Sequence, residues 1–321
     1  MYIKDRKLKI IDYDIIYLSY DEPNAEKNYA DLCSKVPWAK RVHGVEGSDA
    51  AHKACANLSE TDRFITVDGD NQIDPSFLQQ ELNFDEHADL ENSVISWCGK
   101  NVINGLMYGN GGLKCWPRKF VLEMKTHEAA ESDKAQVDFC WELNYIQQNS
   151  CYSYVYNNET PHQAWRAGFR EGVKMALDQG VRVSKEEFLK GHWKNLHRLW
   201  IWLMAGADVD NGLWAIYGAR EGLYKTMCTD WDYVNVRDFE YLNSLWKDKV
   251  QDESDLLEAC EDYGVRLTQQ MDIPIAVTPL DAGQSMFLKT VYQNPSRSPQ
   301  QQFVIDPEWK TIQYVQYRGC I

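Results

Sequence analysis

The stretch FITVDGDNQIDP, residues 64–75, decides how the rest of the chain is interpreted. An apolar run, Phe64–Val67, leads directly into Asp68, Gly69 and Asp70. A short apolar run that ends in turn residues is typical of a buried strand, so both carboxylates are expected at the rim of a sheet. Gly69 lets the backbone turn there and lets a ligand approach closely.

Two carboxylates one residue apart repel each other unless a positive group lies between them. A hard divalent cation, Mn²⁺ or Mg²⁺, is the usual solution, because it binds oxygen ligands and shares its other positions with phosphate oxygens and water. The alternative is a capped turn, in which Asp74 caps a helix that begins at Pro75 while Asp68 and Asp70 are solvated. The position of the pair after an apolar run favours the cation site.

The flanking segments alternate between strand and helix patterns. Strands are expected at 14–20, 39–45, 63–70 and 93–99, and helices at 22–36 and 48–59. This order predicts an α/β fold in which helices cover a parallel sheet. Ligands of such sheets bind at the carboxyl ends of the strands. Three polar segments fall at those ends, at residues 19–22, 46–47 and 68–70.

The character of the chain changes after about residue 160. Helices are expected at 164–179, 185–206 and 254–267, and a loop at 295–302. No Pro/Ser/Gly-rich linker separates the two halves. We therefore expect residues 1–160 to form the α/β domain and residues 161–321 to form a mainly helical region packed against it.

Composition predicts a soluble cytoplasmic protein. The 321 residues are 44% apolar, which is enough for a large core, and no apolar run approaches the roughly 20 residues that span a bilayer. The first residues, MYIKDRKLKI, have no signal-peptide pattern, so no membrane association is expected. Nine scattered cysteines without CxxC spacing indicate reduced thiols.

The net charge of −14 argues against a polyanionic partner. Residues 161–200 nevertheless carry eight Lys/Arg against four Asp/Glu. A local basic patch and an ordinary solvated helix face both explain this segment.

Five blocks, in this order, resemble a family of phage-encoded GT-A-type glycosyltransferases: LSYDEPNAEKNYADL, VHGVEGSDAAHKA, FITVDGDNQIDP, YGNGGLKCWPR and TPHQAWRAGFREGVKM. The resemblance covers roughly residues 14–180. It implies a GT-A-like, mixed but mostly parallel sheet flanked by helices, a nucleotide-sugar donor, UDP-linked, and Mn²⁺ or Mg²⁺ as cofactor. Some related phage enzymes transfer a sugar, arabinose in one group, to hydroxymethylated cytosine in DNA. The implied location is the cytoplasm of an infected host cell.

The resemblance assigns the metal site to three residues. Asp68 and Asp70 match the Asp-x-Asp motif, with Asp70 as the direct ligand, and His162 would complete the site. The alternative for His162 is a loop histidine that only forms hydrogen bonds. Arg166 and Arg170, four residues apart on one expected helix, would hold the donor diphosphate, or they form a plain surface pair.

Residues at the tips of the first two strands are assigned to the nucleotide and ribose of the donor: Ser19, Tyr20, Asp21, Glu22, Glu46 and Gly47. The alternative for Asp21 and Glu22 is an ordinary helix N-terminus, where acidic side chains favour the helix dipole.

The block at 108–118 has three glycines in five residues and is expected to form a loop that contacts the sugar or the acceptor, or else a tight hairpin. Its assigned members are Asn110, Gly111, Gly112, Lys114 and Trp116.

Asp138, at the start of an expected helical run at 134–145, is the candidate base that takes the acceptor's proton. The alternative for Asp138 is a helix N-cap. Inversion and retention at the anomeric carbon both stay open.

Several acceptors and activities remain as alternatives. DNA as acceptor would require Lys and Arg side chains for its phosphates. A glycan or protein acceptor would leave the donor site unchanged. A metal-dependent phosphohydrolase or nuclease would use Asp68, Asp70 and Asp74. A nucleotidyltransferase is disfavoured, because no glycine-rich phosphate loop follows the first strand. A binding protein without activity would keep the fold alone.

Overall fold

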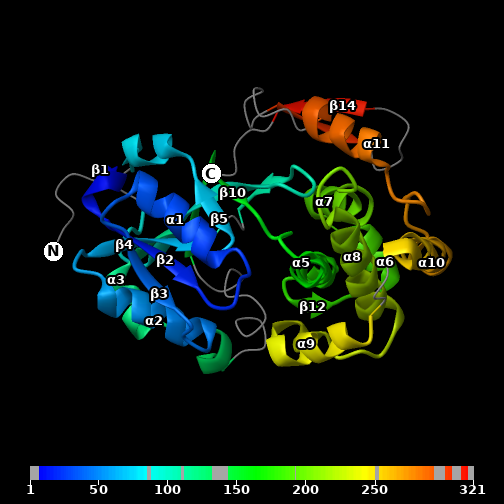
Figure 1. Ribbon diagram of the computed structural model, residues 1–321, viewed down its shortest axis with the longest axis horizontal. Coiled ribbons are helices and arrows are strands. Elements are labelled where there is room, and N and C mark those ends of the chain that lie inside the picture. The colour runs from blue at the N-terminus through cyan, green and yellow to red at the C-terminus, as the bar shows by residue number, and fades with distance from the viewer. Residues whose placement is uncertain are drawn as a thin grey trace. The chain divides into compact units, whose positions relative to one another are not determined.

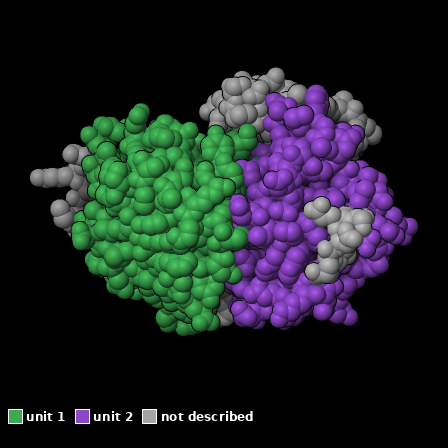
Figure 2. Space-filling model, viewed as in Figure 1, with its two compact units in different colours: residues 1–101, 107–156, 320–321 green, residues 102–106, 157–319 purple. Residues whose placement is uncertain are grey.

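A computed structural model describes residues 7–84, 88–109, 112–131, 144–191, 193–249, 253–292, 301–305 and 312–316. The chain forms two compact units (Figure 2). The first unit contains residues 1–101 and 107–156, and the second contains residues 102–106 and 157–319. A division after residue 160 was the prediction. In the described ranges, no helix has both the length and the apolar character needed to cross a membrane.

The first unit is built on one large mixed sheet (Figure 1). Its strands lie side by side in the order β3 (Lys40–His43), β2 (Asp14–Ser19), β4 (Arg63–Asp68), β9 (Leu113–Pro117), β7 (Ser93–Asn101), β10 (Asn144–Val155) and β5 (Asn71–Ile73), and β8 (Met107–Tyr108) pairs with β7. The predicted α/β class, a mixed sheet flanked by helices, is confirmed.

The direction of the strands differs from the expectation of a mostly parallel sheet. Within the described residues, β2 runs parallel to β3 and β4, and β7 runs parallel to β10. Strand β9, however, lies between β4 and β7 and runs antiparallel to both, and β5 and β8 also pair antiparallel. The parallel arrangement therefore holds at β3–β2–β4, which is the part that ends in the Asp68 turn.

Helices cover both faces of this sheet. Alternate residues of a strand point to opposite faces, so each strand contributes to two cores. One core packs Tyr17 and Trp97 under α1 (Ala25–Lys35) and the 3₁₀ helix η2 (Pro75–Gln79). The other core packs Phe64, Trp116 and their neighbours under α2 (Ser48–Leu58) and α3 (Arg118–Glu123).

The shorter elements of the first unit lie outside the main sheet. Strands β1 (Lys7–Lys9) and β6 (Glu81–Asn83) form a small antiparallel pair, and the 3₁₀ helices are η1 (Ile10–Asp12) and η3 (His127–Ala129).

The second unit is mainly helical. Its helices are α5 (Pro161–Lys174), α6 (Lys185–Leu189), α7 (Trp193–Met204), α8 (Gly212–Cys228), α9 (Phe239–Lys247), α10 (Glu253–Met271) and α11 (Ala282–Phe287). Two short elements lie between these helices: the paired strands β11 (Leu177–Asp178) and β12 (Val181–Arg182), and η5 (Tyr233–Arg237). After α11 come η6 (Leu288–Tyr292) and the paired strands β13 (Gln301–Ile305) and β14 (Ile312–Gln316). The helix expected at 185–206 is two helices, α6 and α7, and α8 was not expected.

Helices α5 and α8 pack backbone against backbone (Figure 1). A Cβ atom placed on Gly168 would lie 1.9 Å from the carbonyl oxygen of Ala215, and one on Gly172 would lie 2.2 Å from that of Ala219. In return, a Cβ on Gly218 would lie 2.1 Å from the carbonyl oxygen of Trp165. Only glycine fits at these positions, and this is why the two helices approach so closely.

Candidate functional site

The turn after β4 is held by hydrogen bonds from three neighbouring elements. Gly69 presents its carbonyl oxygen to the Tyr17 hydroxyl at 2.6 Å and to the Asn28 amide nitrogen at 3.0 Å. The backbone N–H of Tyr156 donates to the carbonyl oxygen of Asp70 at 2.7 Å. The position of Asp70 at the rim of the sheet is therefore fixed by β2, α1 and the end of β10.

Two glycines bring carboxylates close to this turn. A Cβ atom on Gly69 would lie 2.5 Å from Oε2 of Glu22, so the Glu22 carboxylate packs directly on the turn. Gly112 has a φ of +67°, and a Cβ there would lie 2.7 Å from Oδ2 of Asp68. The Asp68 N–H also donates to the Gly112 carbonyl oxygen at 3.1 Å. Asp68, Asp70 and Glu22 also interact electrostatically with one another, so they form one carboxylate cluster at the carboxyl ends of β2 and β4.

The charges of this cluster change its protonation. Burial, together with the neighbouring carboxylates of Asp68 and Glu22, raises the pKa of Asp70 to about 7. Burial likewise raises the pKa of Glu22, with Asp21 and Asp68 contributing. A buried carboxylate that is crowded by others has an unmet demand for positive charge, which a proton or a cation can satisfy.

Lys114 is the cation built into the sheet beside the cluster. It is the second residue of β9, it is only 8% exposed, and its charge lowers the pKa of Asp70. It pairs in register with Thr66 on β4, so Asp68 is its diagonal neighbour on the same face. His52 of α2 covers this face, where its ring meets the Trp116 ring edge-on at 4.8 Å.

The carboxylate cluster fits a hard divalent cation that is shared with a substrate. Across the described ranges, no three His, Cys, Asp or Glu side chains are arranged as a complete metal site. Mg²⁺ in phosphate-handling sites is commonly bound by only one or two carboxylates, with water and substrate phosphates as its other ligands. Asp68 and Asp70 supply that donor set, and the lack of a Cβ at Gly69 and Gly112 makes room for the carboxylates of Glu22 and Asp68.

The tips of β2 and β3 carry the residues predicted for the donor nucleotide. The Ser19 hydroxyl is buried and lies 2.9 Å from Nδ1 of His43, and it accepts from Nε of Arg41 at 3.3 Å. Arg41 also forms a bidentate ion pair with Glu26, at 3.0 and 2.7 Å. Tyr20 is 44% exposed and stands at the rim, where its backbone N–H donates to Oε2 of Glu22 at 2.8 Å.

The N-terminus of α2 is already bound by a carboxylate. Glu128 accepts from the Ala50 N–H at 2.9 Å, and a Cβ on Gly47 would lie 2.3 Å from the same oxygen. Gly47 has a φ of +88°, a conformation that favours glycine. The structure therefore places Gly47 against Glu128, and Glu46 is exposed.

Three predicted residues belong to the second unit, on α5. The His162 ring lies 5.2 Å from the Trp246 ring and 6.1 Å from the Trp165 ring. The guanidinium groups of Arg166 and Arg170 both stack on the Phe239 ring, at 4.9 and 5.0 Å, as a cation–π arrangement. Their metal and diphosphate roles stay predictions.

The expected glycine loop at 108–118 is in large part a strand. Leu113–Pro117 forms β9 in the middle of the sheet. Trp116 is completely buried and donates its indole N–H to Thr66 at 2.9 Å, so it supports the core instead of standing in a loop. Asn110, Gly111 and Asp138 lie outside the described residues.

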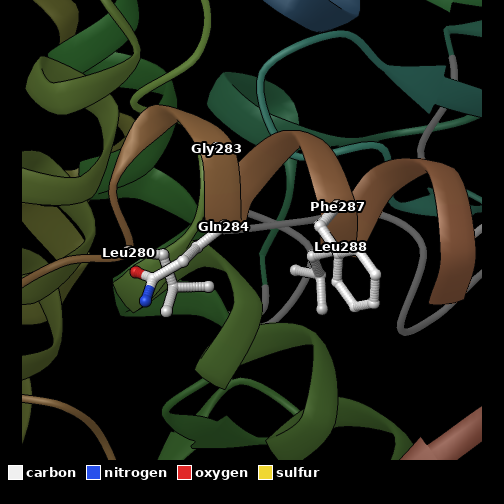
Figure 3. A pocket seen from close by; sticks show the side chains of 5 residues that line it. All are labelled: Leu280, Gly283, Gln284, Phe287 and Leu288. Carbon is white, nitrogen blue, oxygen red and sulfur yellow. The ribbon is translucent and has the colours of Figure 1, made fainter.

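A surface pocket of about 350 Å³ lies along α11 in the second unit (Figure 3). It is lined by Leu280, Gly283, Gln284, Phe287 and Leu288. None of these side chains titrates or binds metals, so the pocket offers no catalytic chemistry.

Sequence reasoning missed several residues that build the site. Tyr17 and Asn28 hold the Gly69 carbonyl, and His52 closes the Lys114 face, yet each sits within an apolar or helical pattern. Glu128 lies far along the chain from Gly47. The α2 block does contain His52, but a lone histidine on a helix is an ordinary core residue, so the signal was weak.

Comparison with known proteins adds a distant structural likeness. No protein-family model and no curated protein matches the chain. Among solved structures, a glycosyltransferase involved in the glycosylation of the major capsid of PBCV-1 is similar over 44% of this chain and 94% of its own, with 11% sequence identity and a TM-score of 0.27. A likeness at this level carries no argument, so the function has to be argued from the chain's own residues.

Proposed function

We propose that the protein is a metal-dependent glycosyltransferase of the GT-A type, which moves a sugar from a nucleotide-sugar donor to a hydroxyl acceptor. The observation that carries the proposal is the carboxylate cluster of Asp68, Asp70 and Glu22, where the pKa of Asp70 is raised to about 7. The cluster lies at the carboxyl ends of β2 and β4, which is where α/β sheets bind nucleotides.

The chain's own residues would divide the work of holding the donor. Asp68 and Asp70 would hold Mn²⁺ or Mg²⁺, which when bound neutralises the charge that develops on a diphosphate leaving group. The exposed Tyr20 ring offers a face for the base. Asp21 and Glu22 offer carboxylates to the ribose hydroxyls, and Gly112 lets the backbone approach the sugar.

The finer parts of the proposal concern the donor and acceptor. We propose a UDP-linked donor, with arabinose among the candidate sugars, and hydroxymethylated cytosine in DNA as the acceptor. His162, Arg166 and Arg170 remain candidates for the metal and the diphosphate, and Asp138 for the base. A glycan or protein acceptor is the alternative, because the donor site would be the same.

A phosphohydrolase or nuclease that uses Asp68, Asp70 and Asp74 is less well supported. Asp74 accepts from the Ser76 N–H at 2.8 Å and from its hydroxyl at 2.6 Å. It is therefore the N-cap of η2, as one interpretation of the sequence expected. A capping carboxylate that is already bound contributes little to a second metal.

The test is a transfer screen on the intact protein. The protein is incubated with Mn²⁺ or Mg²⁺ and a panel of nucleotide sugars, with and without DNA that contains hydroxymethylcytosine, and digested nucleosides are analysed by mass spectrometry. A pentose or hexose mass on the modified cytosine supports the whole proposal. Donor hydrolysis without a DNA product supports only the glycosyltransferase. The absence of metal-dependent turnover with any donor would contradict the enzyme proposal.

A further inference from the structure

Lys114 is a largely buried residue whose charge acts on the carboxylate cluster without an ion pair to it. Its residue is 8% exposed, and no ion pair or hydrogen bond of its ammonium group is formed with the part of the chain that the structure describes. The stem of a lysine can be buried while its ammonium group reaches polar surroundings, so the charge of Lys114 can act at the rim of the sheet.

The sheet geometry directs this cation to the carboxylate cluster. Thr66, Lys114 and Ser96 lie in one row across β4, β9 and β7. Asp68 is two residues beyond Thr66 on the same face, so it is diagonal to Lys114 and within reach of a long side chain. The ring of His52 and the core around Trp116 cover that face, so the Lys114 side chain meets polar groups toward the rim of the sheet.

We propose that Lys114 is a positioning residue that competes with the divalent cation at Asp68 and Asp70, so that the cation binds tightly only together with a diphosphate. This inference rests on the proposed metal site. A fixed ammonium group repels a second cation that approaches the same carboxylates. A diphosphate brings negative charge for both, and so it couples its own binding to that of the cation.

The mechanism makes a directional claim about binding, independent of turnover. Removing the ammonium group should tighten Mn²⁺ binding in the absence of nucleotide. It should at the same time weaken the ability of UDP to promote Mn²⁺ binding. If Lys114 only supports the strand, its removal should change the Mn²⁺ affinity with UDP and the Mn²⁺ affinity without UDP in the same direction, or change neither.

The experiment measures free Mn²⁺ by electron paramagnetic resonance during titration of the protein, with and without UDP. For Lys114→Met we expect Mn²⁺ alone to bind about tenfold more tightly than to the wild type, as expected for removing one nearby charge at an effective dielectric typical of a protein rim. The factor by which UDP increases Mn²⁺ affinity should be smaller in Lys114→Met than in the wild type, by about fivefold or more. Lys114→Arg should restore both values.

Lys40→Met is the matched control. Lys40 lies at the opposite, amino-terminal end of the parallel strands, where it pairs with Asp14 at 3.0 Å. It removes the same charge from the same sheet and should leave Mn²⁺ affinity unchanged. Circular dichroism checks that each variant is folded, and Lys114→Gln takes the place of Lys114→Met if methionine prevents folding.

Each outcome decides between the two proposals. Equal or weaker Mn²⁺ binding by a folded Lys114→Met or Lys114→Gln would overturn the role of Lys114 and leave the metal site standing. A wild type and variants that all fail to bind Mn²⁺ would overturn both. The expected binding changes in a protein that turns over no donor would support Lys114 and contradict the glycosyltransferase.

Discussion

At the scale of single residues, the carboxylate cluster lowers the stability of the folded state and provides a site for a ligand. Asp70 is held beside Asp68 and Glu22 by a turn whose carbonyl groups are bonded to Tyr17, Asn28 and Tyr156. The fold thus holds like charges together. Sites that are built for a ligand often have such an arrangement, because the ligand supplies the missing interaction.

Replacing Asp70 with Asn should separate stability from function. The pKa of Asp70 is raised to about 7 and lies above that of a carboxyl group in the unfolded chain, about 4. The folded state therefore binds this proton more tightly, and stability falls as the pH rises from about 4 to about 7. In metal-free buffer, Asp70→Asn should melt at a higher temperature than the wild type at pH 8 and at nearly the same temperature at pH 5.

The same variant should lose metal-dependent behaviour. Mn²⁺ should raise the melting temperature of the wild type at pH 8, since a ligand that binds only the folded state stabilises it. It should not raise that of Asp70→Asn, which should also lose transfer activity. Differential scanning calorimetry with EDTA or Mn²⁺ measures the melting temperatures, and the transfer screen measures the activity. Full activity of Asp70→Asn, or an equal rise in melting temperature, would contradict the metal assignment.

Gly112 tests the space beside Asp68. A Cβ atom at this position would lie 2.7 Å from Oδ2 of Asp68, and the φ of +67° disfavours any other residue. Gly112→Ala should displace the Asp68 carboxylate and weaken Mn²⁺ binding about tenfold or more, with a stability loss of about 1–3 kcal/mol from backbone strain. Isothermal titration and urea unfolding measure the two effects.

The control for Gly112 is Gly44, which has a similar φ of +70° and open space around its Cβ position. Gly44→Ala should therefore incur backbone strain without displacing a carboxylate. The same loss of Mn²⁺ affinity in Gly44→Ala would show that strain, and not the contact with Asp68, causes the effect.

At the scale of elements, the glycines of α5 and α8 set the packing of the second unit. Gly168→Val would place side-chain atoms where the Ala215 carbonyl oxygen now lies, so the helices would have to separate. We expect a loss of about 3 kcal/mol or more in the free energy of unfolding, at the upper end of overpacking effects. Ala167→Val, at the adjacent and partly exposed position, should cost less than about 1 kcal/mol. Urea unfolding followed by tryptophan fluorescence compares them, and equal losses would contradict this account.

The elements also show what the sequence could and could not predict. Strands β2, β3 and β4 and helices α1 and α2 follow local patterns of apolar residues, and they were predicted with boundaries close to those observed. Strand β9 was missed because all five of its residues are buried, which removes the alternation that marks a strand, and because glycines precede it. Helix α8 is apolar around much of its surface, so its periodic signal is also weak.

At the scale of the whole molecule, the site could be predicted only where its residues are near in sequence or at equivalent strand ends. Asp68 and Asp70 could be predicted as site residues from their position after an apolar run. Glu22 and Gly69 follow the ends of the neighbouring strands β2 and β4, so their proximity could be expected. The contact of Glu128 with Gly47 joins segments far apart in the chain that no pattern of strand ends relates.

The net charge of −14 opposes DNA binding by the molecule as a whole, and this makes the proposal of a DNA acceptor testable. A protein of this charge repels DNA on average, so binding would have to come from a local basic segment such as residues 161–200. Lys190 is an exposed member of that segment, beside the end of α6. If DNA is the acceptor, Lys190→Glu should weaken duplex binding and reduce the slope of log K against log salt by about one to two units.

Fluorescence anisotropy at several salt concentrations measures this slope. Lys9→Glu is the control, because Lys9 is exposed on β1 and pairs with Glu81 at 3.4 Å, outside the basic segment. It imposes the same change of net charge on the molecule. If both variants lose the same affinity, the effect is one of overall charge, and the basic segment is not the DNA surface. If neither the wild type nor the variants bind duplex DNA at low salt, an acceptor without phosphates, a glycan or a protein, becomes the better proposal for the same donor site.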